Sequence, residues 1–100
     1  MKPVTVINRI MVKPGKMDEF IDVQQHFAGT LPSGFLVGGR MYRSLDGQSA
    51  VLVSTFRSAG ARDEVFQRAE FKAHLERLAP LVESSSPILY EEAYTTGDFR

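Results

Sequence analysis

Residues 4–12 read Val-Thr-Val-Ile-Asn-Arg-Ile-Met-Val, a pattern that predicts a long first β-strand. Side chains alternate between the two faces of a strand, so every second residue from Val4 to Val12 shares one face. Four of these five side chains are apolar and β-branched, and the fifth is the amide of Asn8. A buried amide without a hydrogen-bond partner costs roughly 1–3 kcal/mol. Asn8 therefore has either a local partner or a ligand that faces it.

Composition limits the classes of function that this chain can have. It has 100 residues, 12 basic and 12 acidic side chains, and no cysteine. This length predicts a single domain, residues 1–100. Balanced charge argues against nucleic-acid binding, which requires an excess of Lys and Arg to neutralise phosphates. Without cysteine there is no disulfide and no thiolate site. We find no long apolar run and no leader, and therefore expect a cytoplasmic protein that does not enter a membrane.

Apolar residues follow a helical period in two regions and alternate in four others. Asp46-Gly47 is a hairpin signal, and Ser58 is a plausible helix N-cap. Ser84 to Pro87 is expected to be a loop. In chain order, the predicted elements are a strand at 4–12, a helix at 17–31, strands at 35–43 and 49–57, a helical region from 58 to about 82, a strand at 88–95 and a polar tail at 97–100.

The order β-α-β-β-α-β predicts an α+β, ferredoxin-like fold with one four-stranded antiparallel sheet and two helices on one face. The other face would carry Ile7, Arg9 and Met11 from the first strand. Such a partly apolar face needs a cover, and a two-fold dimer is the commonest closed assembly. We therefore expect a homodimer through the sheet faces, which is a dimeric α/β-barrel.

Two polar residues are candidates for chemistry. Asn8 either bonds to a neighbouring group or donates to a carbonyl, a phenolate or bound dioxygen. His74 lies at the edge of an apolar helical stripe, where it is either a satisfied structural residue, a general base or an iron ligand. The spacing of His26 and His74 matches no metal-binding motif, so we expect no metal site. A single aromatic, Phe56, on the third strand argues against an RNA-recognition surface.

Several short segments resemble one known family over nearly the whole chain. The chain looks like the antibiotic biosynthesis monooxygenase family of dimeric α+β barrels. The segments that carry this resemblance are Val12–Phe20 (VKPGKMDEF), Gly34-Phe35, Phe56-Arg57-Ser58 and Phe71–Leu75 (FKAHL).

The resemblance implies cofactor-independent oxygenation of an electron-rich aromatic, such as a quinol, an anthrone or a polyketide intermediate. The partners would be this small apolar substrate and O2. Asn8 would orient an oxyanion or peroxide, and His74 would be the base. The side chains expected to bind the substrate are Phe27, Phe56, Phe66 and Phe71.

Two alternatives stay open. A haem-degrading branch of the family uses a first-strand Asn, a second-helix His as iron ligand and a helical Trp. Asn8 and His74 match the first two, and Ser85–Ile88 resembles the start of that branch's last strand. The Trp would fall near Phe66, and the chain has no Trp. The other alternative is a non-catalytic dimer that binds a small ligand.

Overall fold

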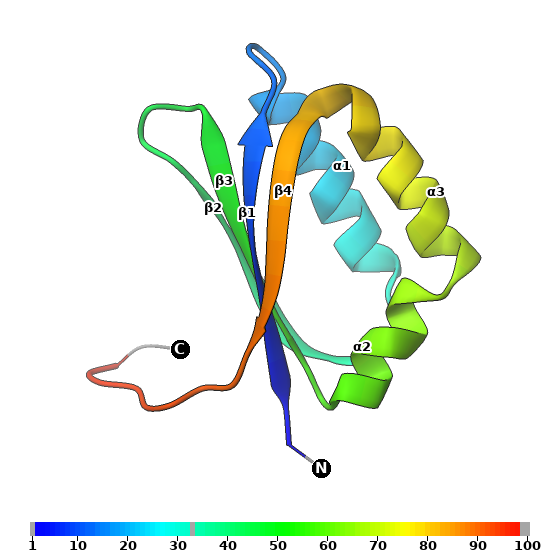
Figure 1. The fold of residues 1–100 in the computed structure, drawn as a ribbon, viewed down its shortest axis with the longest axis vertical. Helices are drawn as coiled ribbons and strands as arrows, with labels where there is room; N and C mark the ends of the chain where they lie inside the picture. Colours follow the sequence, from blue (N-terminus) through cyan, green and yellow to red (C-terminus); the bar gives the residue numbers. More distant parts are fainter. Residues whose placement is uncertain (1, 33, 99–100) are drawn as a thin grey trace.

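The computed structural model describes residues 2–32 and 34–98, and it confirms the predicted ferredoxin-like α+β fold. The sheet has the strand order β2-β3-β1-β4, and every neighbouring pair is antiparallel. Helices α1 and α3 lie together on one side of this sheet (Figure 1). The elements are β1 (Val4–Val12), α1 (Met17–Thr30), β2 (Leu36–Arg43), β3 (Ser49–Phe56), α2 (Ala59–Phe66), α3 (Ala69–Leu78), the 3₁₀ turn η1 (Ala79–Leu81) and β4 (Val82–Tyr90).

Strand β1 is central, with β3 on one side and β4 on the other. Its residues Val6, Ile10 and Val12 are buried on the face that meets the helices. Phe20 of α1 is fully buried in the same core as Ile10. The alternation predicted for residues 4–12 is therefore confirmed, and Asn8 lies on this helix-facing side between Val6 and Ile10.

The β2–β3 hairpin follows the predicted turn and glycine signals. Gly47 has a φ of 76° in the turn, a conformation that glycine adopts without steric cost. The register shifts between Leu36 and Gly38, as expected for a bulge. A Cβ on Gly39 would lie 3.2 Å from the backbone oxygen of Val53, so this strand passes close to β3.

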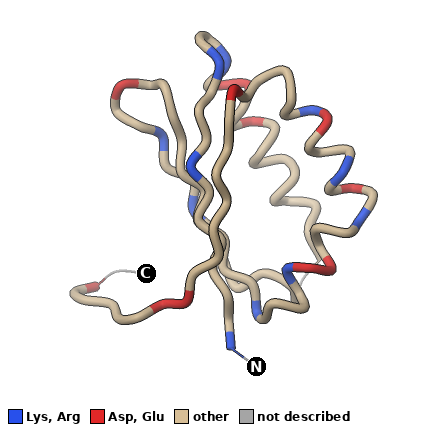
Figure 2. The backbone as a smooth tube through the Cα atoms, in the orientation of Figure 1, with Lys and Arg blue, Asp and Glu red and all other residues tan. Residues whose placement is uncertain are grey.

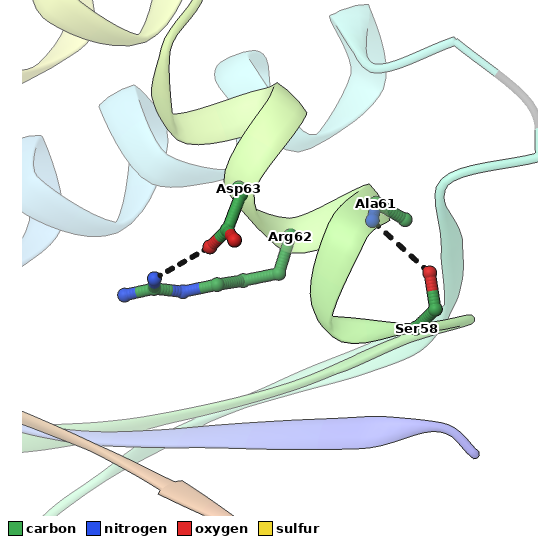
Figure 3. Close-up of polar contacts among 4 residues, drawn as sticks. All are labelled: Ser58, Ala61, Arg62 and Asp63. Atoms are coloured by element: carbon green, nitrogen blue, oxygen red, sulfur yellow. Dashed lines mark hydrogen bonds and ion pairs between the residues drawn. The ribbon is translucent and has the colours of Figure 1, made fainter. Parts of the chain in front are cut away.

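Ser58 begins α2 as predicted, because its Oγ accepts a hydrogen bond from the backbone N–H of Ala61 at 3.1 Å (Figure 3). One turn later, Arg62 and Asp63 form an ion pair at 3.0 Å. The helical region then breaks at Arg68, whose ψ of 149° is extended. Arg68 takes the N-cap position of α3, where a non-helical backbone is normal. The α-helical hydrogen bonds end at Leu78, just before Pro80, as the proline predicted.

The prediction for the last strand was wrong in its bounds. Ser84 to Pro87 was expected to be a loop, but this segment pairs with β1 inside β4. Residues 91–95, expected to be strand, form neither helix nor strand and leave the sheet (Figure 1). Serine has little intrinsic preference for strands, but pairing with the central strand decides the outcome. Pro87 is tolerated because β4 is an edge strand. Of the predicted polar tail at 97–100, residues 99–100 lie outside the described residues.

Candidate functional site

A cavity of about 380 Å³ lies between the sheet and helices α1 and α3. This volume is in the range of small-molecule sites. Most of the lining is apolar, with two amides, two serines and one carboxylate among it. The lining residues are Asn8, Ile10, Phe20, Gln24, Leu75, Leu78, Ala79, Val82, Glu83, Ser84 and Ser85.

Asn8 lines this cavity and also has a local partner. Its Oδ1 accepts a hydrogen bond from the backbone N–H of Ser86 at 3.0 Å. Asn8 lies opposite Pro87 in the register of β1 and β4, where the proline has no N–H to offer the ladder. The side-chain oxygen thus fixes the edge strand, while the Nδ2 group has no partner among the described residues. The sequence left two roles open for Asn8, a bond to a neighbouring group and donation to a ligand, and this geometry is compatible with both.

Gln24 of α1 is the second amide in the lining. Its Oε1 lies 3.0 Å from Nε2 of His74, which reaches it from α3. An amide oxygen only accepts hydrogen bonds, so Nε2 of His74 carries the proton and Nδ1 does not. The two residues are 50 positions apart in the sequence, and this bond joins the two helices across the core.

His74 itself does not line the cavity. Its side chain is buried, and its ring stacks on Phe27 with 4.1 Å between centroids and 8° between planes. Nδ1 is buried and has no hydrogen-bond partner within residues 2–32 and 34–98. Burial and, to a smaller extent, the positive charge of Arg77 lower the pKa of His74 to about 4. His74 is therefore neutral at pH 7 and acts on the cavity only through Gln24.

The four phenylalanines predicted to bind substrate form a stack beside His74 rather than around Asn8. Phe66 and Phe71 are parallel at 4.5 Å, and Phe56 meets Phe66 edge to face at 6.1 Å. Phe27 and Phe71 line a small hollow of about 80 Å³. None of the four lines the larger cavity. The structure thus separates these aromatic side chains from Asn8.

The sequence analysis missed Gln24 and Glu83. Gln24 interrupts the apolar stripe of α1 just as Asn8 interrupts that of β1, so a polar residue at an inward position was an available signal. Glu83 gave no such signal, because it lies in the segment between η1 and the expected last strand. Its place in the cavity depends on the start of β4 at Val82.

The described residues do not fit a haem with His74 as iron ligand. Nε2 is engaged by Gln24, and the face of the ring is covered by Phe27. Within residues 2–32 and 34–98, no three His, Asp or Glu side chains are grouped so that they could hold a metal ion. In the same part of the chain, no helix is long and apolar enough to span a membrane.

Charged side chains are interspersed along the chain rather than gathered by sign. Figure 2 shows acidic and basic residues alternating along α2 and α3. Exposed pairs such as Arg68 with Glu70, at 3.2 Å, neutralise one another locally.

Comparison with known proteins identifies the family of this chain. The family model described as antibiotic biosynthesis monooxygenase matches residues 3–77. The chain belongs to this family. The match includes β1 with Asn8, α1 with Gln24 and most of α3 with His74. No curated protein sequence matches the chain.

Solved structures share the fold. A variant of SnoaB, a cofactor-independent oxygenase from Streptomyces nogalater, has a TM-score of 0.84 and 24% identity over 95% of this chain and 97% of that chain. Rv0793 from Mycobacterium tuberculosis has a TM-score of 0.80 and 20% identity over 96% of this chain and 100% of that chain. Identities at this level show that the three chains share a fold.

Proposed function

We propose that this chain is a cofactor-independent monooxygenase that oxidises an electron-rich aromatic substrate with O2 in the cavity beside Asn8. The observation that carries the proposal is the Nδ2 group of Asn8, which has no hydrogen-bond partner in the described part of the chain and belongs to a largely apolar cavity of about 380 Å³. Family membership and the description of SnoaB as a cofactor-independent oxygenase support it.

The reaction needs no external reductant when the substrate is of the anthrone type. Anthrone and O2 give anthraquinone and water: the ring CH2 becomes C=O, one oxygen atom enters the product and the other leaves as water. The substrate supplies all four electrons. Loss of a proton from the CH2 group gives an enolate, which is electron-rich enough to reduce O2.

The protein would assist by stabilising the enolate oxygen. An amide N–H aimed at a developing oxyanion in a water-poor site lowers the barrier because it is already oriented. Asn8 is held in place through Oδ1, so its Nδ2 group is available for this role. The apolar side chains of the lining would contact the ring system of the substrate.

Two residues are candidates for the base that removes the proton from the substrate. Proton removal by His74 stays a prediction from the sequence, and its contact with the cavity runs through Gln24. Glu83, an exposed residue at the start of β4, is the one ionisable residue in the lining of the cavity. A carboxylate in this place can accept a proton from the substrate.

Oxygen uptake with anthrone tests the proposed function. We expect the purified protein, after dialysis against EDTA, to consume one O2 per anthraquinone formed, well above the rate in buffer. Haemin titration is the matched test of the haem alternative, and we expect no new Soret band. Binding of anthrone without oxygen uptake would instead favour the non-catalytic ligand-binding dimer.

We also propose that the open face of the sheet pairs with a second copy of the chain. Ile88 and Tyr90 of β4 lie opposite Ile7 and Thr5 of β1 on this face. Ile88 is 52% exposed and Tyr90 is 45% exposed. An apolar surface on a sheet face is a common site of association between copies.

Ile88→Glu is expected to convert a dimer into a monomer, because it places a charge in the apolar interface. Light scattering coupled to gel filtration would measure the mass at low micromolar concentration. Leu89→Glu is the matched control, since Leu89 is similarly exposed at 46% but points to the opposite face. A monomeric wild-type chain, or equal dissociation by both variants, would contradict this interface.

A further inference from the structure

Two side-chain amides line the same cavity, and each is anchored through its oxygen. Asn8 Oδ1 accepts from the backbone of Ser86, and Gln24 Oε1 accepts from Nε2 of His74, both at 3.0 Å. The two amides come from different elements, β1 and α1, that pack on opposite sides of the cavity. The arrangement does not follow from the resemblance, which assigns no role to Gln24.

Anchoring by oxygen determines what the amides can offer a ligand. An amide has two N–H donors and one acceptor oxygen. In both residues the oxygen already accepts one hydrogen bond, and the NH2 group has no partner among the described residues. Each amide therefore presents donors to the cavity, so the cavity matches a ligand oxygen that accepts hydrogen bonds.

Glu83 narrows the class of ligand. Glu83 is also a lining residue of the cavity, and its negative charge disfavours an anionic ligand there. The rest of the lining is mainly apolar, with Phe20, Leu75 and Leu78 among it. A neutral aromatic ketone satisfies all three conditions: an apolar frame, an acceptor oxygen and no charge before reaction.

We propose that Gln24 is a substrate-binding residue, that it and Asn8 form a two-amide clamp on a carbonyl oxygen of a neutral aromatic ligand, and that His74 positions Gln24 for this role. The inference rests on the proposed function, because it concerns the same cavity. It adds the second donor, the class of ligand and a role for the buried His74.

His74 is well placed to hold the amide. It is 4% exposed, and the stack on Phe27 fixes the plane of its ring. A flipped Gln24 amide would donate to Nε2 and would require the proton on Nδ1, where the N–H would be buried without an acceptor among the described residues. The Nε2–H tautomer avoids this cost and leaves the NH2 group of Gln24 available to a ligand. His74 thus acts as a positioning residue that does not touch the ligand.

Binding of fluorenone and fluorene to the full chain tests the clamp. The two probes have the same planar frame, and only fluorenone has a carbonyl oxygen. Gln24→Glu keeps an oxygen for His74 and replaces the donor by an acceptor, so we expect the Kd of fluorenone to rise about tenfold. The Kd of fluorene should change less than twofold. Gln25→Glu, at the neighbouring exposed position, is the control and should change neither.

The positioning role of His74 needs a separate readout. His74→Phe keeps an aromatic ring on Phe27 but loses Nε2–H, and we expect about threefold weaker binding of fluorenone. His74→Gln restores an N–H donor and should recover most of the affinity. The infrared stretching frequency of the bound ketone should rise in Gln24→Glu and His74→Phe and return in His74→Gln, since it reports the hydrogen bonds to the carbonyl.

The outcomes separate the clamp from the proposed function. If neither probe binds the wild-type chain, both proposals fail. If both probes bind but Gln24→Glu weakens the binding of both equally, or of neither, the cavity is an aromatic binding site and the proposed clamp is wrong. Should Gln24→Glu fail to fold, Gln24→Leu replaces it, judged by the same difference between the two probes.

Discussion

Asn8→Asp is expected to lower kcat/KM for the oxidation of anthrone about 100-fold, the cost typical of removing one preorganised donor to an oxyanion. The substitution is selective because of the geometry at β4. Asp keeps an oxygen that accepts from the backbone N–H of Ser86, now at 3.0 Å from Oδ1. It replaces the Nδ2 group by an oxygen, which repels the enolate oxygen that the wild-type amide would stabilise. Initial rates of oxygen uptake measure the loss.

Stability and a neighbouring substitution provide the controls for this result. The urea midpoint of Asn8→Asp should stay close to that of the wild type at pH 7, because the bond to Ser86 survives. Ser86→Ala removes only an exposed hydroxyl and keeps the backbone donor, so its rate should be unchanged. An Asn8→Asp variant that retained at least half of the wild-type rate would show that Asn8 serves only to hold β4.

Stretches whose packing is local were predictable from the sequence. The alternation in residues 4–12 reports directly which side chains of β1 meet the core, and Val6, Ile10 and Val12 are buried as expected. Ser58 was identified as a cap because capping depends on residues within one turn. In both cases the physical cause lies within a few residues of the observed effect.

Features set by long-range pairing were not predictable in the same way. Ser84 to Pro87 has a loop-like composition, and only its register against β1 makes it a strand. The bond between Gln24 and His74 joins positions on two helices whose relative height is a property of the packed core. The sequence marked both Asn8 and His74 as polar residues at inward positions, but it could not indicate that one faces a cavity and the other a ring.

Lowering the pH from 7.5 to 4.5 is expected to cost the wild-type chain about 2.5 kcal/mol of unfolding free energy through His74 alone. Burial lowers the pKa of His74 from its ordinary 6.5 to about 4 in the folded chain. Between these values the unfolded chain binds a proton at this position and the folded chain does not. Acid therefore favours unfolding: the contribution is fully present above pH 6.5, declines as the pH falls and is lost by about pH 4. Urea unfolding across this range measures it.

The comparison with His74→Gln isolates this contribution from the titration of carboxylates, which both chains share. The variant has no imidazole to protonate, so its stability should fall less steeply below pH 6.5. Between pH 7.5 and 4.5, the wild type should lose about 2.5 kcal/mol more unfolding free energy than the variant. His26→Gln removes an exposed histidine of α1 and should retain the wild-type pH dependence. Parallel curves for the wild type and His74→Gln would mean that the folded chain accepts a proton on Nδ1, the buried nitrogen that now has no partner. His74 would then be charged at mildly acidic pH with its Nε2–H still bonded to Gln24, so the two-amide clamp would survive protonation of the ring.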